Sequence, residues 1–215
     1  MSRSSPGYRL KIQSLMATFV FGGKRVTTMK RKYRAKLGLT TLTIIVGIGL
    51  TPIANAKSIA TPISRSRWPH AQVTYVIQAS ASERRVYQAA IRAWNATGQF
   101  KFVQGTTAHH QVTLGTSNAT TGQYYRLAGI TFSTGYPNGY YTKAQVYLLT
   151  RNFTRYHYSY SDQVHVAEHE LGHTIGLEHS RDRHSVMLAD NRYNGISSAD
   201  STAVRLRYRL PVGRL

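Results

Sequence analysis

Cysteine is absent from this sequence, which excludes disulfide bonds, thiolate zinc sites and a cysteine nucleophile together. Acidic residues are scarce: eight Asp and Glu stand against 28 Lys and Arg, giving a formal net charge of +20. No internal repeat is visible, and 215 residues are too few for two full enzyme domains. A hydrophobic share of 41% is still enough to form a core, which argues against disorder throughout the chain.

The positive charge is unevenly divided. Residues 1–56 contain ten basic residues and no acidic one, whereas the rest of the chain has 18 basic and eight acidic residues, a net charge of +10. The charge on the rest suggests an anionic neighbour, such as a cell-wall polymer or a membrane surface, and a merely soluble basic surface is an equal alternative. We expect no specific nucleic-acid partner, because no recognised motif accompanies the charge.

The segment 29–56 has the features of a signal peptide. A basic stretch is followed by an apolar run from Leu37 to Leu50, and Ala54-Asn55-Ala56 has the small-x-small form of a cleavage site. The apolar run is shorter than the roughly 20 residues of a membrane span, although an uncleaved anchor is the alternative. We therefore expect a secreted, extracellular protein that begins at Lys57, with the cell wall as one place of association.

Three further segments complete the predicted organisation. Residues 1–28 precede the start of an ordinary signal, and we expect them to be a non-native upstream extension or disordered. Residues 57–67 are polar and contain Ser, Thr and Pro, which predicts a flexible lead-in. The functional, folded domain is then expected to span residues 68–215, and we expect it to be a monomer.

This domain has the pattern of an α+β fold. Alternating and β-rich segments predict strands at residues 73–77, 100–103, 111–114, 130–132 and 144–149. Capping residues and apolar periodicity predict helices over residues 82–97, 162–176 and about 198–210. We expect a mixed, twisted sheet with two to three helices.

One short segment contains the residues expected to carry the chemistry. His169 and His173 are four residues apart, so both imidazoles project from one face of the predicted helix. Gly176 allows the chain to turn sharply out of that helix, which returns His179 as a third ligand. Three protein ligands leave one zinc coordination position open, as in catalytic sites. Glu170 is turned about 100° from His169, where it can act as a base rather than a ligand.

Two other interpretations of this segment are weaker. A solvent-facing helix rich in His and Glu would not be flanked by so many apolar residues, and the glycine and third histidine at fixed spacing make the pattern specific. His165 also lies four residues before His169, but that pair would leave neither Glu170 nor His179 usefully placed. We expect His165 to be partly exposed or hydrogen-bonded.

The pattern resembles that of the metzincin metalloproteases, and within them a bacterial, secreted matrixin. Met187 resembles the methionine of the Met-turn beneath the zinc, and Ser180 directly follows the third histidine as in matrixins. Residues 67–69, Arg-Trp-Pro, resemble the start of a matrixin catalytic domain. Leu127-Ala128-Gly129 resembles the edge strand along which matrixins align substrate. The resemblance implies a metzincin-like fold and a zinc-dependent endopeptidase.

The sequence departs from the family in ways that affect its cofactors. No Asp or Glu occurs between Glu83 and Asp162, where animal matrixins place carboxylates of structural zinc and calcium sites. Calcium needs oxygen ligands, so we expect one catalytic Zn²⁺ and neither structural zinc nor calcium. Latency through a propeptide thiolate is excluded by the absence of cysteine. Leu188-Ala189 stands where the family commonly has Tyr-Pro, which alters the expected wall of the specificity pocket.

The expected function is hydrolysis of peptide bonds in proteins, with Glu170 as general base and His169, His173 and His179 holding zinc. Met187 and Gly176 are expected to support the site, and Leu127, Ala128 and Gly129 to bind substrate. Two alternatives remain open: an exported, basic cell-wall-binding protein with a non-catalytic zinc site, and a hydrolase of peptidoglycan peptides.

Overall fold

The computed structural model describes the backbone of residues 11–19 and all atoms of residues 60–214. The predicted signal peptide, 29–56, lies outside the described residues. The strands are β1 (Lys11–Phe19), β2 (Gln72–Gln78), β3 (Lys101–Gln104), β4 (Val112–Ser117), β5 (Leu127–Gly135) and β6 (Tyr141–Leu149). The helices are α1 (Ala81–Ala96), α2 (Thr150–Arg155), α3 (Tyr160–Thr174) and α4 (Ser198–Arg209), with a 3₁₀ turn at Gly122–Tyr124. None of the helices in these ranges is long and apolar enough to cross a membrane.

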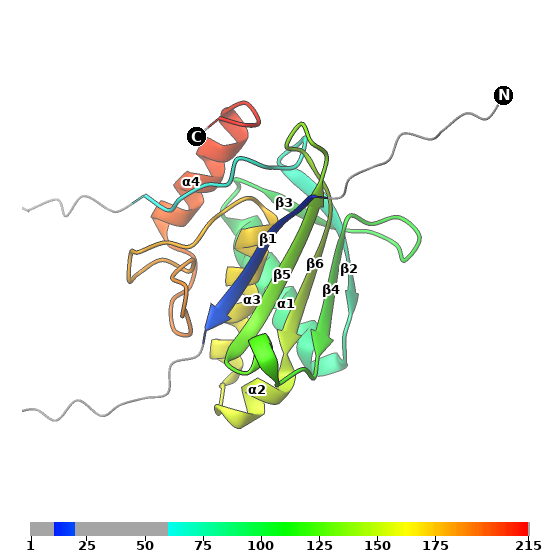
Figure 1. The fold of residues 1–215 in the computed structure, drawn as a ribbon, viewed down its shortest axis with the longest axis vertical. Coiled ribbons are helices and arrows are strands. Elements are labelled where there is room, and N and C mark those ends of the chain that lie inside the picture. The colour runs from blue at the N-terminus through cyan, green and yellow to red at the C-terminus, as the bar shows by residue number, and fades with distance from the viewer. Residues whose placement is uncertain (1–10, 20–59, 215) are drawn as a thin grey trace, which may run out of the picture. The chain divides into compact units, whose positions relative to one another are not determined.

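The strands form one mixed sheet in the order β1-β5-β6-β4-β2-β3. β5 pairs antiparallel with both β1 and β6, whereas β6, β4, β2 and β3 run parallel to one another. Figure 1 shows α1 and α3 packed side by side against one face of the sheet, with α2 at one end. The long helix α3 crosses β5 and β6, which brings the predicted zinc-site helix against the predicted substrate strand.

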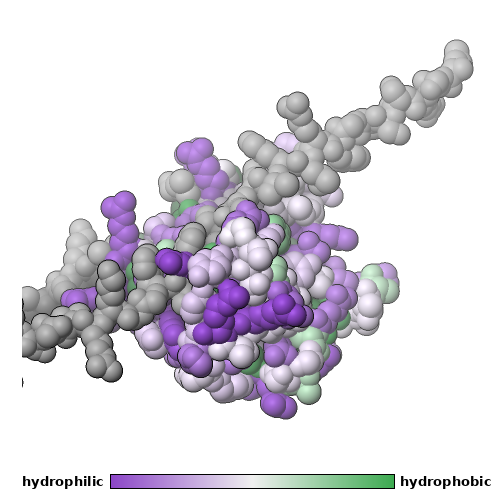
Figure 2. All heavy atoms as spheres, turned by 60° about the horizontal axis from the view of Figure 1, so that its bottom comes forward, coloured by the Kyte–Doolittle hydropathy of each residue, from purple (hydrophilic) through white to green (hydrophobic). Residues whose placement is uncertain are grey.

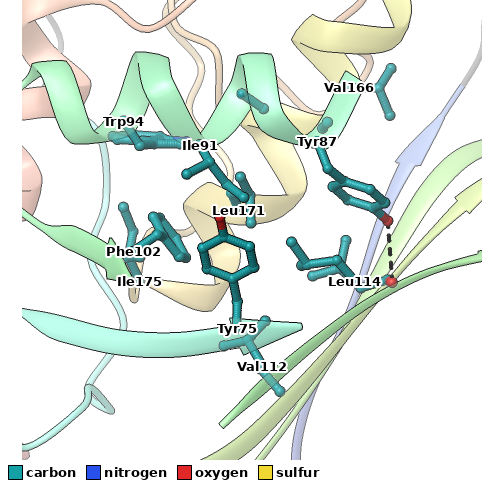
Figure 3. Packing of buried hydrophobic residues seen from close by; sticks show 14 of the residues in the cluster. Tyr75, Tyr87, Ile91, Trp94, Phe102, Val112, Leu114, Val166, Leu171 and Ile175 are labelled. Carbon is teal, nitrogen blue, oxygen red and sulfur yellow. Dashed lines mark hydrogen bonds between the residues drawn. The ribbon is translucent and has the colours of Figure 1, made fainter. Parts of the chain in front are cut away.

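The core lies between the sheet and the two long helices. Side chains from α1, such as Trp94 and Tyr87, pack with Leu171 from α3, with Ile175 just after that helix, and with strand residues such as Leu114 (Figure 3). The buried Tyr87 hydroxyl donates to the Gly115 carbonyl at 2.6 Å, so its polar group is satisfied inside the core. This packing fixes the axis of α3 relative to the sheet.

The α+β fold with a mixed sheet is confirmed, with four α-helices in the described residues rather than two or three. The helix missed from the sequence is α2, six residues long, which is too short to show a periodic pattern. Strand β5 is also longer than the predicted 130–132, because it continues to Gly135 between two partners.

The segment expected to be a flexible lead-in, 57–67, is partly paired with the domain. Ile63 forms an antiparallel bridge with Leu177, and Arg67 forms a parallel bridge with Tyr140. The Ser64 amide also donates to the Gly176 carbonyl at 2.8 Å. The described part of this segment therefore lies along the turn that follows α3.

Figure 2 turns the end at which α2 lies towards the viewer and shows a band of strongly hydrophilic side chains across a largely pale surface. Helix α2 supplies Arg151 and Arg155, and the guanidinium groups of Arg155 and Arg126 lie 5.6 and 5.7 Å from the ring centre of Tyr125. Part of the positive charge counted in the sequence is therefore displayed on one exposed surface.

Candidate metal centre

Helix α3 begins and ends with strong capping motifs. Ser159 and Asp162 form a reciprocal capping box at its start. At its end, the Leu177 amide donates to the Gly172 carbonyl and the Gly176 amide to the His173 carbonyl, the hydrogen-bond pair of a Schellman motif. Gly176 has φ of +93°, a conformation that side chains disfavour. The predicted role of Gly176 as the sharp exit from the helix agrees with this geometry.

The three predicted histidines converge. His169, His173 and His179 each offer a ring nitrogen, and these three atoms all lie within 4.8 Å of one another. His169 and His173 are one helical turn apart on α3 and are buried, while His179 returns on the segment after Gly176. Within the described residues, no other group of three or more His, Asp or Glu side chains is close enough to hold a metal ion.

Hydrogen bonds on the far side of two rings fix their orientation. The Nδ1 atom of His169 lies 2.7 Å from the Val186 carbonyl, and that of His173 lies 2.9 Å from the Leu177 carbonyl. A carbonyl can only accept, so each Nδ1 carries the proton and each neutral ring presents an Nε2 lone pair.

The inner side of the triad has the chemistry of a cation site. The two Nε2 atoms of His169 and His173 face each other at 3.1 Å, two lone pairs without a shared proton. The Nε2 atom of His179 is buried and has no hydrogen-bond partner among the residues that the structure describes. Three imidazole nitrogens that meet in this way match the donor set and geometry that zinc prefers, so the residues present fit the ion.

Burial keeps these imidazoles neutral. Desolvation is the main cause that lowers the pKa of His169 to about 3, with a further contribution from the charge of His179. The same burial holds the pKa of His173 well below its ordinary value and also lowers that of His179. Neutral imidazole is the form that binds metal, so the site is ready to accept a cation at neutral pH.

Glu170 lies on the side of α3 that faces β5. Its carboxylate accepts a hydrogen bond of 2.7 Å from the Thr131 hydroxyl, and both residues are buried. A Cβ atom at Gly129 would stand 2.6 Å from both Cγ and Oε1 of Glu170. Glycine is therefore needed at position 129 to admit the carboxylate. Thr131, which no sequence pattern indicated as a site residue, orients it.

Met187 supports α3 from below. The side chain is fully buried, and a Cβ at Gly172 would come within 2.3 Å of its sulfur. Gly172 directly precedes His173 on α3, so the thioether packs against the helix close to a residue of the triad. The Met187 carbonyl also accepts from the Ser180 amide at 2.8 Å, which ties this turn to the residue after His179.

A buried carboxylate that was not predicted as a site residue anchors the same turn. Asp200 accepts from the Val186 amide at 3.0 Å and from the Ser185 hydroxyl at 2.5 Å. The Val186 carbonyl is the partner of His169 Nδ1, so the backbone of a single residue, Val186, links Asp200 to the triad. The Ser197–Asp200 capping box of α4 is visible in the sequence, but its reach to position 186 is a tertiary feature.

The other residues considered in the sequence lie outside the triad, two of them in β5 and one on α3. Leu127 and Ala128 are buried at the start of β5, whose outer edge is paired with β1. His165 is partly buried, and its Nδ1 lies 3.2 Å from the Arg192 carbonyl, as expected for a hydrogen-bonded histidine outside the triad.

An α+β domain in which three imidazoles meet on and just after one helix, with a glutamate following the first of them, defines a metzincin-type zinc peptidase. Comparison with protein families matches residues 67–208 to the matrixins, Peptidase_M10. The chain belongs to the matrixin family and is a zinc metalloendopeptidase, which hydrolyses peptide bonds in proteins or peptides. A comparison with curated proteins gave no match.

Proposed function

We propose that this protein is a secreted endopeptidase in which His169, His173 and His179 hold a single Zn²⁺ and Glu170 is the general base. The observations that carry the proposal are the convergence of three buried imidazole nitrogens and the position of Glu170, the residue after the first of these histidines, whose carboxylate is held at β5. A site that only stabilised the fold would have no need of a base beside it, which argues against the alternative of a non-catalytic zinc site.

The chain's own groups divide the reaction between them. When bound, zinc supplies Lewis-acid chemistry that acidifies a water molecule and polarises a carbonyl. Glu170 accepts the proton of the attacking water and later donates it to the leaving nitrogen of the cleaved peptide. Thr131 and Gly129 hold and admit the Glu170 carboxylate, while the Val186 and Leu177 carbonyls keep two imidazoles in the binding orientation.

Substrate selection follows from the position of β5. An extended peptide that adds to the outer edge of this strand would gain backbone hydrogen bonds with little dependence on its sequence. Such pairing would run past Gly129 and Thr131, the residues in contact with Glu170.

A proteolysis assay tests the proposal. Purified chain should hydrolyse casein or gelatin, the activity should disappear with a chelator, and added Zn²⁺ should restore it. The His179→Ala variant should lose both zinc and activity. Zinc-loaded protein without any peptidase activity would contradict the proposal.

The expected metal content needs its own measurement. The proposal is one zinc per chain, with neither structural zinc nor calcium, because no carboxylate lies between Glu83 and Asp162. Equilibrium dialysis followed by elemental analysis should find one tightly bound zinc. A second tight metal, or a tight calcium ion, would refute this part.

Secretion and surface association are further parts of the proposal. N-terminal sequencing of exported protein should begin at Lys57, after the predicted cleavage site, and another start would refute that site. The exposed side chains of Arg126, Arg151 and Arg155 on and near α2 favour retention of a monomeric enzyme on an anionic polymer or membrane surface. Loss of turbidity from purified cell walls would instead favour the alternative substrate, peptidoglycan peptides.

A further inference from the structure

The outer edge of β5 is paired with a segment from the N-terminal part of the same chain. Strand β1 runs antiparallel to β5, with Ala17 opposite Ile130, Met16 opposite Thr131 and Phe19 opposite Leu127. In Figure 1, β1 is the dark blue strand that lies along β5 at the margin of the sheet. No sequence pattern indicated a strand at residues 11–19, and this side of β5 was expected to align substrate.

This pairing lies beside the candidate metal centre. Thr131 lies opposite Met16, and Gly129 lies in the irregular stretch between the pairs Ala17–Ile130 and Phe19–Leu127. Both β5 residues lie against the Glu170 side chain. Backbone atoms of β1 also approach α3, the helix that supplies Glu170 and two of the histidines. The covered part of the edge is therefore the part next to the reacting groups.

The edge of a strand offers one row of backbone hydrogen-bond donors and acceptors, and a single paired strand occupies all of them. Two extended chains cannot pair with the same row at the same time. Residues 11–19, Lys-Ile-Gln-Ser-Leu-Met-Ala-Thr-Phe, contain no proline and a single charge, so every residue can take part in a ladder. The segment is thus a peptide ligand of the type that a strand-addition site accepts.

We propose that residues 11–19 occupy the substrate-aligning edge of β5 as an intramolecular strand, so that the chain inhibits itself until that segment is removed. The inference rests on the proposed function, because it takes the edge of β5 as the place where substrate pairs. Covalent connection gives β1 an effective concentration on the order of millimolar, against which a free peptide must compete. Cleavage after Ala56 would remove the segment, which couples export to activation.

The test uses the full chain with two substitutions in β1. In Met16→Pro/Ala17→Pro, one of the two adjacent positions belongs to a hydrogen-bonded pair, because such pairs alternate in antiparallel strands. Proline removes the donor there and disfavours the strand. The matched control, Met16→Val/Ala17→Val, keeps both amides and a strand-compatible backbone.

Two measurements are made on both variants and on the unaltered chain. In the proline variant, the amides of Leu127–Thr131 that face β1 should exchange with deuterium about tenfold faster, and kcat/KM for a short extended peptide should rise about tenfold. The valine control should match the unaltered chain both in amide exchange at β5 and in kcat/KM. Unchanged exchange at β5, or unchanged kcat/KM in an active enzyme, would overturn the inference.

A binding measurement separates this inference from the proposed function. In a Glu170→Gln background, a labelled synthetic peptide with the sequence of residues 11–19 should bind the proline variant about tenfold more tightly than the chain with intact β1. A peptide with a scrambled sequence should bind the proline variant and the chain with intact β1 equally. If the zinc-loaded proline variant, with β1 displaced, hydrolyses nothing, the proposed function fails. Equal binding of the peptide together with unchanged exchange at β5 overturns the inference about β1.

Discussion

Each of the three histidines is held in a different way. The Val186 carbonyl orients His169, and the Leu177 carbonyl orients His173. His179 is placed by the course of the chain after the glycine turn at Gly176. The spacing of the motif predicted all three, because helical geometry and a glycine turn are local properties. Thr131 and Asp200 could not be predicted in the same way, since they approach α3 and the turn from remote parts of the chain.

The contact between Gly172 and Met187 gives a prediction at this scale. Gly172→Ala should lower the free energy of unfolding by about 1–3 kcal/mol, since the new methyl group overlaps the buried sulfur. By helix propensity alone, replacing glycine with alanine should stabilise the helix by about 1 kcal/mol. A decrease in the free energy of unfolding would therefore identify the overlap with the sulfur as the cause. Urea unfolding of the single variants and of Gly172→Ala/Met187→Ala measures it.

The double variant is the control for that explanation. If the sulfur is what the new methyl group meets, the cost of Gly172→Ala should vanish in the Met187→Ala background. An equal cost in both backgrounds would show that Met187 is not responsible.

At the scale of elements, α3 is the part that the sequence predicted best. The residues for its capping box and for its glycine exit are local, and the predicted range, 162–176, differs from the observed one by two residues at each end. Pairing of β5 with β1 was unpredictable, because it depends on the register between segments more than 100 residues apart.

Asp162 links the start of α3 to the loop that carries Arg192. Burial disfavours its ionisation, but hydrogen bonds from the Ser159 amide and Arg192 outweigh this and hold the pKa of Asp162 below its ordinary value of 3.8. The native state then binds fewer protons than the unfolded chain near that pH, so this stabilisation is present at neutral pH and falls as the pH falls.

Asp162→Asn should therefore cost about 1 kcal/mol of unfolding free energy at pH 7. The difference from the unaltered chain should shrink as the pH drops below 3.8. Urea unfolding at a series of pH values, with the metal removed throughout, measures the difference. Asp190→Asn, at an exposed position, should show no such trend, and a pH-independent cost for Asp162→Asn would contradict the account.

At the scale of the whole molecule, Arg207 joins the two ends of the described domain. Its fully buried guanidinium donates to the Ser64 carbonyl at 2.8 Å and to the Arg214 and Pro211 carbonyls at 2.7 and 2.6 Å. Its side chain also lies 3.3 Å from the Cβ position of Gly176. The segment before β2, the C-terminal tail and the turn after α3 therefore meet at one side chain.

Loss of this junction should destabilise the domain. Arg207→Met keeps much of the volume but leaves four carbonyls, those of Ser64, Leu210, Pro211 and Arg214, without their charged donor, which should cost about 2–4 kcal/mol. Thermal unfolding compared with Arg205→Met, at an exposed position on the same helix, measures the effect. The control should change stability by less than about 0.5 kcal/mol, and equal behaviour of the two variants would refute the role of Arg207.

The most direct test of the account is a paired measurement of bound zinc and peptide hydrolysis in the unaltered chain and in Glu170→Gln. Glutamine keeps an acceptor for the Thr131 hydroxyl but cannot take up a proton, so both proteins should bind one zinc per chain. The variant should lose about 10²–10⁴-fold in kcat. Zinc-loaded Glu170→Gln with the activity of the unaltered chain would contradict the claim that Glu170 is the base beside a three-histidine zinc site.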